Sequence, residues 1–248
     1  MTHTYTNLMV DRLNIEEQKT FYNERWGEFE FANRLKLMRC TAILRAMAAS
    51  GLYQPKIIDL GSGTGWLAGI IGNFGPTTGV ELSNTAVIEA SRKYPHVQFM
   101  DEDILQWDYP KETFDIVVSQ EDIEHIEVQK AYLDVAHGLL RPKGYLILTT
   151  PNARTFEAMP KHQREAWSNQ PIENWLTVAE LRDLLQHRFE VVRLTTIIPN
   201  HGILGVYRFV NSVWLKALFQ RLRLGNSFDS LRLNLGYGLH TLAVARKK

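Results

Sequence analysis

Short apolar runs alternate with amphipathic stretches along most of this chain. Five runs of four to seven residues hold mostly apolar side chains and are bounded by turn-forming or acidic residues, which predicts buried strands. The stretches between them carry apolar residues at helical spacing. We expect strands at 56–60, 78–82, 97–100, 114–119 and 144–150, and helices at 66–73, 85–93, 127–140 and 177–187. Such alternation predicts a mostly parallel, doubly wound α/β sheet with helices on both faces.

The pattern changes before the first of these strands. Residues 14–50 are expected to be helical, because Leu35, Met38 and Ala42 fall near one helical stripe and Gly51 is a plausible stop. We interpret residues 1–50 as an N-terminal helical cap that precedes a ligand-binding core at 51–199.

Two further strands are expected near the other end, at 189–198 and 238–246, with about forty residues between them. If the 189–198 strand runs parallel to the others, the intervening residues leave the sheet at its carboxyl edge, where ligands bind in open α/β sheets. We therefore expect a helical insertion at 200–237 that serves as a lid or substrate wall, followed by the closing strand of the core at 238–248.

A glycine-rich turn joins the first strand to the helix after it. Glycines at 61, 63 and 65 allow a tight turn and a close approach of a ligand to the backbone. A dinucleotide site needs glycine at the sixth position of this motif, where the chain has Trp66. Glycine at the fifth position, with Asp59 two residues before the first glycine, is typical of S-adenosylmethionine sites.

Acidic residues follow the next strands at matching positions. Glu81 ends the second strand and can accept hydrogen bonds from two ribose hydroxyls. Asp103 is expected at the end of the third strand and suits an adenine amino group, with Ile104 placed to pack on the ring. Gln120 follows the fourth strand, at the edge where a transferred group would lie. Each residue alone has an ordinary structural explanation, such as a helix cap, but together they predict a nucleoside site.

These segments resemble the class I S-adenosylmethionine-dependent methyltransferases over roughly residues 30–195 and 238–246. The resemblance rests on residues 58–65, 79–83, 101–104, 114–118 and 139–145. It implies a seven-stranded sheet with an antiparallel last strand. It also implies that Asp59 and the glycine loop surround the methionine part, Glu81 binds ribose, and Asp103 with Ile104 frames adenine. The predicted cofactor-binding residues are Asp59, Gly61, Ser62, Gly63, Gly65, Glu81, Leu82, Asp103, Ile104 and Gln120.

Glu121, Glu124 and His125 fall within one helical turn after the fourth strand. Two carboxylates and an imidazole suit a divalent cation such as Mg²⁺, whereas His125 alone suits a general base that accepts a hydroxyl proton. The Glu-x-x-Glu-His pattern resembles ubiquinone-biosynthesis O-methyltransferases and small-RNA 3′-terminal 2′-O-methyltransferases, in which it is associated with a metal. Gln170 stands where those families would place a further metal-binding histidine. Stabilisation of a helix N-terminus by Glu121 and Asp122, with His125 packed beneath the ligand, is the structural alternative.

Composition limits the classes of partner and the cellular compartment that we expect for this chain. Lys and Arg number 28 against 27 Asp and Glu, a balance that argues against a protein-wide field for binding nucleic acid. One cysteine, Cys40, excludes an internal disulfide and suits a reducing compartment. No apolar run approaches the ~18 residues that span a bilayer, and no secretory signal is visible. We therefore expect a cytoplasmic protein, with its oligomeric state open.

The resemblance implies methylation of a small-molecule or lipid-like acceptor, most simply at a hydroxyl, with His125 and Glu121 as catalytic residues. N-methylation, RNA ribose 2′-O-methylation and a non-catalytic cofactor-binding role are the alternatives. The apolar and basic stretch 203–224 suits peripheral membrane contact, a lipid-like acceptor, dimer packing or simple cover of the sheet.

Two N-terminal features remain open at this stage. Trp26, Phe29 and Phe31 suit a flap over the cofactor or buried packing. Arg39 suits the methionine carboxylate or a solvated helix face.

Overall fold

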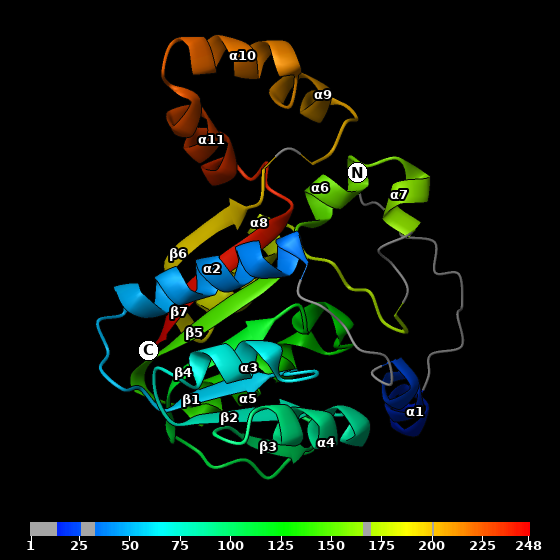
Figure 1. The fold of residues 1–248 in the computed structure, drawn as a ribbon, viewed down its shortest axis with the longest axis vertical. Helices are drawn as coiled ribbons and strands as arrows, with labels where there is room; N and C mark the ends of the chain where they lie inside the picture. The colour runs from blue at the N-terminus through cyan, green and yellow to red at the C-terminus, as the bar shows by residue number, and fades with distance from the viewer. Residues whose placement is uncertain (1–13, 26–32, 166–169, 200) are drawn as a thin grey trace.

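A computed structural model describes residues 14–25, 33–165, 170–199 and 201–248. Its centre is a seven-stranded sheet in the order β3-β2-β1-β4-β5-β7-β6 (Figure 1). The last strand in sequence, β7, lies between β5 and β6 and runs antiparallel to both, and the other strands are parallel to one another. The strands are β1 (Ile57–Leu60), β2 (Thr77–Glu81), β3 (Gln98–Asp101), β4 (Phe114–Gln120), β5 (Leu140–Pro151), β6 (Phe189–Ile197) and β7 (His240–Lys247). The predicted mostly parallel sheet with an antiparallel last strand is confirmed.

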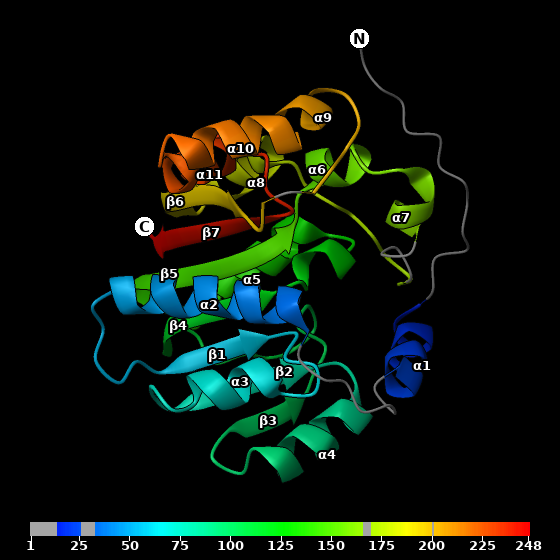
Figure 2. The same ribbon diagram turned by 45° about the horizontal axis from the view of Figure 1, so that its top comes forward.

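Helices cover both faces of this sheet (Figures 1 and 2). On one face lie α2 (Arg34–Ala49), α3 (Trp66–Ile71) and α4 (Asn84–Lys93), and on the other lie α5 (Gln129–Leu139) and α8 (Val178–Gln186). Alternate residues of β4 supply the two cores, since successive strand side chains point to opposite faces. Ile116 and Val118 pack with α2 and α3, whereas Val117 packs with α5 and α8. The apolar runs of β1, β2, β4 and β5 therefore form doubly covered strands, as predicted. The run predicted as a buried strand at 97–100 instead forms the edge strand β3, which has no buried residue.

The N-terminal stretch forms two helices in place of one continuous run. Helix α1 spans Ile15–Arg25, and α2 begins at Arg34 because the side chain of Asn33 accepts a hydrogen bond from the backbone N–H of Lys36. Helix α2 packs on the sheet through Cys40, Ile43 and Met47. Trp26, Phe29 and Phe31, the predicted flap residues, lie outside the described part of the chain.

Short elements follow β4 and β5 at the carboxyl edge of the sheet. A single 3₁₀ turn, η1 (Ile123–His125), follows β4, and α6 (Ala153–Glu157) and α7 (Lys161–Glu165) follow β5. Strand β5 begins four residues before the predicted start at 144, and β3 ends at Asp101, so Asp103 lies in the loop beyond that strand.

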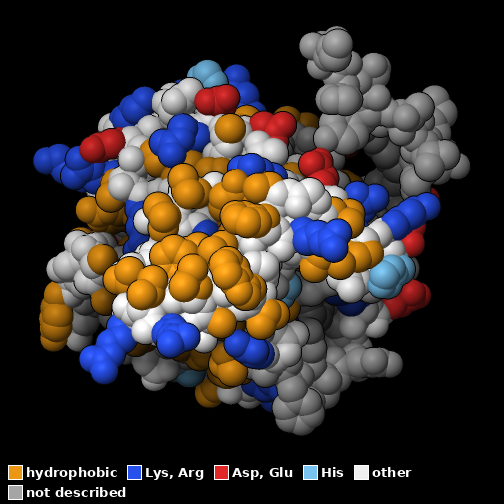
Figure 3. All heavy atoms as spheres, turned by 90° about the horizontal axis from the view of Figure 1, so that it is seen from above, with side chains coloured by type: hydrophobic (Ala, Val, Ile, Leu, Met, Phe, Trp, Pro, Cys, Tyr) orange, Lys and Arg blue, Asp and Glu red, His pale blue; other side chains and the backbone are white. Residues whose placement is uncertain are grey.

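Three helices form the insertion between β6 and β7. They are α9 (Val206–Val210), α10 (Val213–Arg221) and α11 (Gly225–Asn234), and they lie beyond the β6 side of the sheet (Figures 1 and 2). Seen from the side of these helices, the surface carries many hydrophobic side chains with Lys and Arg around them (Figure 3). Among the described helices, none combines the length and apolar character that crossing a bilayer requires.

Candidate active site

A cavity of about 530 Å³ opens at the carboxyl ends of the strands. The glycine loop, the ends of β2 and β4, the loop after β3, the start of α2 and the segment 170–175 border it. Of the ten predicted cofactor residues, all but Gly65 line this cavity, as do Glu121, Glu124 and His125. No described residue of the insertion 200–237 lines the cavity, so its role as a lid or substrate wall stays a prediction.

The glycine loop takes a conformation that only glycine adopts without strain. Gly61, Gly63 and Gly65 have φ angles of 67°, 51° and 76°, all in the left-handed region. A Cβ atom at Gly61 would overlap the side chain of Asp122, and one at Gly65 would overlap the ring of Phe99. The loop therefore brings its backbone against the cavity, and Gly65 serves the packing beneath it.

Glu81 fixes the loop from the end of β2. Its two carboxylate oxygens accept hydrogen bonds from the backbone N–H groups of Gly63, at 2.9 Å, and Ser83, at 3.0 Å. Burial raises the pKa of Glu81 to about 7, with repulsion from Asp122 adding to the rise and the backbone N–H bonds opposing it. The carboxylate faces the cavity with capacity to accept further hydrogen bonds.

Asp59 and Asp122 complete an acidic floor, by which we mean Asp59, Glu81 and Asp122. Burial and the neighbouring carboxylates raise the pKa of Asp59 well above its ordinary value, and burial raises that of Asp122 to about 6. Three buried acids this close repel one another when ionised, and a cation between them would relieve that repulsion.

Several buried polar atoms beside the floor have no hydrogen-bond partner among the described residues. They are Oδ2 of Asp59, Oγ of Ser62 and Nε2 of Gln120, and all three residues line the cavity. Buried polar groups in folded proteins are normally paired, so these atoms indicate a missing polar ligand. A sulfonium nucleoside, whose ribose hydroxyls and α-ammonium group can donate and whose carboxylate can accept, fits this set of one carboxylate oxygen, one hydroxyl and one amide donor.

The residues predicted to frame adenine also line the cavity. Ile104 is buried, and Asp103 accepts a hydrogen bond from the backbone N–H of Leu105 through Oδ1, at 2.9 Å. Asp103 therefore stabilises its own loop, as the helix-cap alternative proposed, while the residue still borders the cavity. Leu82 borders it as well.

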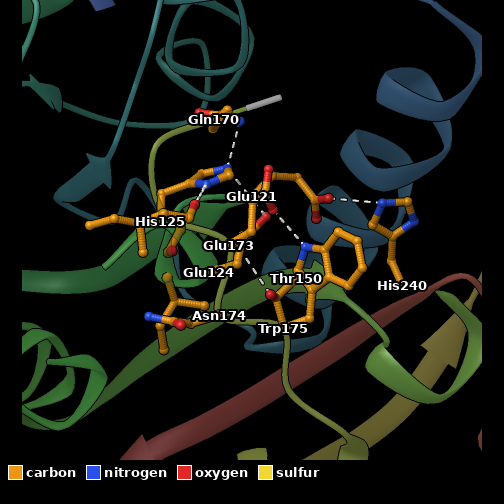
Figure 4. A network of polar contacts seen from close by, with 12 residues as sticks. Glu121, Glu124, His125, Thr150, Gln170, Glu173, Asn174, Trp175 and His240 are labelled. Carbon is orange, nitrogen blue, oxygen red and sulfur yellow. Dashed lines mark hydrogen bonds and ion pairs between the residues drawn. The ribbon is translucent and has the colours of Figure 1, made fainter. Parts of the chain in front are cut away.

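His125 has its tautomer set by a backbone carbonyl (Figure 4). Its Nδ1 lies 2.8 Å from the carbonyl oxygen of Ile172, which can only accept, so Nδ1 carries the proton. Burial lowers the pKa of His125, although the Ile172 carbonyl and Glu121 oppose that shift. The ring is therefore neutral near pH 7, and its basic atom is Nε2. This atom lies 2.7 Å from Nε2 of Gln170, whose amide donates to the lone pair.

Segment 170–175 holds His125 in place from the opposite wall. The backbone N–H of Asn174 donates to the carbonyl of Glu124 at 2.7 Å, and Gln129 donates to the carbonyl of Asn174 at 2.8 Å. These bonds position segment 170–175 so that the carbonyl of Ile172 meets Nδ1 of His125. The sequence pattern marked Gln170 only, and it gave no sign that Ile172 would act through its backbone.

Glu173 was not expected from the sequence. Its Oε2 accepts a hydrogen bond from the indole N–H of Trp175 at 2.7 Å, whereas Oε1 is buried with no partner among the described residues. Burial raises the pKa of Glu173 to about 7. Both residues line the cavity beside Phe156, whose ring centroid lies 4.6 Å from that of Trp175. This wall combines aromatic surface with one carboxyl group.

Glu121 forms ion pairs within the protein at the wall of the cavity (Figure 4). Its Oε2 lies 2.8 Å from Nε2 of His240, and its Oε1 lies 3.8 Å from Nε of Arg39. Burial would raise the pKa of Glu121, but the attraction of His240 and Arg39 outweighs it and holds the pKa at about 2. Arg39 is buried and borders the cavity, so the solvated-face alternative does not hold.

The structure does not support the predicted metal set of Glu121, Glu124 and His125. No group of three or more His, Cys, Asp or Glu side chains that could hold a metal ion occurs in the described ranges. The physical reason is that each side chain has another partner: Glu121 pairs with His240, Glu124 accepts from the Thr150 hydroxyl at 2.9 Å, and Gln170 covers Nε2 of His125.

Comparisons with known proteins agree with this geometry. A family model described as "Methyltransferase domain" matches residues 31–194. A protein of Mycolicibacterium smegmatis named "Probable S-adenosylmethionine-dependent methyltransferase" is 27% identical over 137 residues, 52% of this chain and 49% of that protein. This chain thus spans about half the length of that relative.

Two other matches cover more of the chain. A ubiquinone biosynthesis O-methyltransferase of Actinobacillus pleuropneumoniae is 29% identical over 205 residues, 70% of this chain and 86% of that protein. The crystal structure of N-methyltransferase NodS from Bradyrhizobium japonicum, in complex with S-adenosyl-L-homocysteine, has a TM-score of 0.64 at 14% identity and covers 93% of this chain and 98% of NodS. That likeness shows a shared fold.

Proposed function

We propose that this chain, which belongs to the methyltransferase-domain family, methylates a hydroxyl of a small-molecule or lipid-like acceptor with His125 as general base. The family match confirms the resemblance inferred from the glycine loop. The observation that carries the proposal is the hydrogen bond between Nδ1 of His125 and the Ile172 carbonyl, which leaves the lone pair of Nε2 at the cavity.

The residues at the strand ends would hold S-adenosylmethionine. Glu81 would accept hydrogen bonds from the ribose hydroxyls, Asp59 and the glycine loop would surround the methionine part, and Asp103 with Ile104 would border adenine. When bound, this cofactor supplies an activated methyl group attached to a sulfonium leaving group. The acidic floor favours a cation, because the pKa values of Asp59, Glu81 and Asp122 are all raised by burial and any positive charge would oppose that rise.

His125 would then take the acceptor's proton. A substrate hydroxyl that displaces the Gln170 amide would donate to Nε2, and this O–H bond would break as the new O–C bond forms and the C–S bond of the cofactor breaks. The imidazolium that results would be stabilised by Glu121, whose charge raises the pKa of His125. Glu124, whose Oε1 lies 3.9 Å from Nε2 of His125, has its own pKa raised well above the ordinary value by burial and by the charge of Glu121. Of the two glutamates of the Glu-x-x-Glu-His pattern, Glu121 would thus support the base by its charge, with no metal step.

The wall of Phe156, Trp175 and Glu173 would receive the acceptor. Aromatic surface suits an aromatic or lipid-like compound, in keeping with the O-methyltransferase of Actinobacillus pleuropneumoniae. The unpartnered Oε1 of Glu173 favours a second candidate, N-methylation of an amine, because a carboxylate there would attract a cationic acceptor. An amine that has lost its proton needs no strong base, so the two candidates differ in their dependence on His125.

Transfer of a labelled methyl group to fractionated extracts tests this proposal. We expect label in the small-molecule or lipid fraction and none in RNA, with or without chelator. His125→Asn should lower kcat by about 10²- to 10⁴-fold, the usual contribution of a general base. Its matched control is His162→Asn, which changes an exposed histidine on α7 outside the cavity. Equal rates for the two variants, with equal affinity for S-adenosylhomocysteine, would contradict the proposed base. If Glu173→Gln loses activity and His125→Asn does not, N-methylation of an amine is favoured over methylation of a hydroxyl.

A further inference from the structure

The insertion exposes an unusual amount of apolar surface. Of nineteen large hydrophobic side chains that are exposed in the described chain, eleven lie between residues 203 and 235. Within the insertion, the most exposed of these side chains are Val213, Trp214 and Phe209, with 83%, 76% and 68% of their surface accessible. Scattered exposed apolar residues are ordinary, but a contiguous group of this kind marks an interaction site.

Helix α10 shows why this surface lacks a partner within the chain. Trp214, Leu218 and Leu222 recur at intervals of four residues and so share one helical face, yet none of the residues of α10 is buried. The hairpin of α10 and α11 is closed on another side, where the rings of Phe219 and Phe228 stack with centroids 4.3 Å apart. The exposed face is therefore additional to the packing that holds the hairpin together.

The same segment has a net positive charge, whereas the rest of the chain is net negative. Residues 201–237 hold five of the 28 Lys and Arg but one of the 27 Asp and Glu, which gives them a formal charge of +4 against −3 for the remainder. That one acid, Asp229, pairs with the buried Arg232. Arg208, Arg221 and Arg223 are exposed, and Lys and Arg lie around the hydrophobic side chains in Figure 3.

The insertion is fastened to an element that borders the cavity. The hydroxyls of Tyr207 and Thr155 lie 2.8 Å apart, and the backbone N–H groups of Ile203 and Leu204 donate to the carbonyl of Ala158. Thr155 belongs to α6, and the next residue, Phe156, lines the cavity. The exposed face is thus held in a defined position relative to the acceptor wall.

We propose that α9–α11 dock on an anionic lipid surface, with Phe209, Val213 and Trp214 entering the headgroup region and Arg208, Arg221 and Arg223 facing lipid phosphates. Apolar side chains with basic residues around them match both parts of such a surface. A second copy of this chain fits less well, because each copy would present the same +4 segment to the other. The inference uses the insertion alone and does not depend on methyl transfer.

Co-sedimentation of the full chain with vesicles tests this docking. We expect at least tenfold stronger partitioning onto vesicles of 70% phosphatidylcholine and 30% phosphatidylglycerol than onto pure phosphatidylcholine, weakened by salt. Trp214→Ser with Phe209→Ser should reduce binding about tenfold, as should Arg221→Glu with Arg223→Glu. Phe74→Ser, at an exposed phenylalanine outside the insertion, is the control and should bind as the unchanged protein does.

Three outcomes would overturn the proposal. One is no preference for the anionic vesicles, and another is equal binding of the Trp214 variant and the Phe74 control. The third is a dimer in sedimentation equilibrium that Trp214→Ser abolishes, since a second copy would then cover this face. Circular dichroism and affinity for S-adenosylhomocysteine show that each variant is folded. Because vesicle binding is measured without any acceptor, its failure is separate from failure of the proposed methyl transfer.

Discussion

The acidic floor and the ion pairs of Glu121 show two opposite environments for carboxyl groups in one cavity. In the cofactor half, the acidic floor of Asp59, Glu81 and Asp122 keeps three carboxyl groups close together, and burial raises the pKa of each. In the acceptor half, Glu121 is paired with His240 and Arg39 and its pKa is held at about 2. The pKa of a carboxyl group at this sheet edge is thus raised where acids lie together and lowered where Glu121 pairs with His240 and Arg39. Glu124 and Glu173, which lie near Glu121, are buried without such a pairing and have raised pKa values.

This difference separates groups that await a ligand from groups that support the wall. Oδ2 of Asp59 and Nε2 of Gln120 have no partner among the described residues, so a ligand can bind without displacing protein contacts. Glu121 and His125 already have protein partners, so their first role is to hold each other and segment 170–175 in position. Substitutions in the first half should therefore change binding, and substitutions in the second should change stability or pH dependence.

The largest effect is expected for cofactor binding. Glu81→Gln places an amide where two backbone N–H groups and the ribose hydroxyls need an acceptor, and charged hydrogen bonds contribute about 1.5–3 kcal/mol each. We expect the Kd for S-adenosylhomocysteine to rise about 10²- to 10³-fold in calorimetry. Asp108→Asn, at an exposed acid, is the control. If the Kd of a folded Glu81→Gln variant rises less than tenfold, Glu81 does not bind the ligand.

A smaller effect is expected for stability. Glu121→Ala leaves Arg39 and His240 buried without their carboxylate, and removing one partner of a buried ion pair costs about 3 kcal/mol. The corresponding fall in Tm is about 6–12 °C in a chain of this size. Glu190→Ala, which breaks an exposed pair with Arg246, should leave Tm nearly unchanged. Equal Tm values for the two variants would show that the ion pairs of Glu121 with Arg39 and His240 do not stabilise the protein.

The same cluster gives a pH dependence of stability. Because the folded pKa of Glu121 is about 2 against an ordinary 4.5, its contribution is fully present above pH 4.5 and is lost as the pH falls toward 2. Acid unfolding of Glu121→Ala should therefore be less steep in that range than acid unfolding of the unchanged protein.

The smallest effect is a shift in the pH profile. Because burial lowers the pKa of His125, we expect the acid limb of kcat/KM to lie below the ordinary histidine value of 6.5. Gln170→Glu puts a carboxylate against Nε2, which favours the imidazolium and should move that limb up by about 1–2 pH units. Gln163→Glu, exposed on α7, should not move it. Coincident profiles for these two variants would place the titrating group elsewhere.

Local motifs predicted the cofactor half of the site well. A glycine loop after β1 and polar residues at successive strand ends must meet, because parallel strands bring their carboxyl ends to one edge. For this reason the sequence alone could place Asp59, Glu81 and Gln120 at one cavity, which all three line. The alternation predicted parallel strands but not the order in which they lie.

The acceptor half depended on contacts that no local pattern encodes. His240 reaches Glu121 because β7 pairs antiparallel with β5 and places His240 opposite Pro151. The Ile172 carbonyl sets the tautomer of His125 through its backbone, so its side-chain identity carries no signal. The Glu-x-x-Glu-His spacing was compatible with a metal, but these distant partners occupy the side chains instead.

Proton release on cofactor binding tests the central contrast most directly. At pH 6.5 the raised pKa values of Glu81, about 7, and Asp122, about 6, leave protons on the acidic floor that a bound sulfonium and ammonium would expel. Titration of S-adenosylmethionine by calorimetry in buffers of different ionisation enthalpy should show release of on the order of one proton per site. Binding without proton release, or no binding at all, would contradict the account.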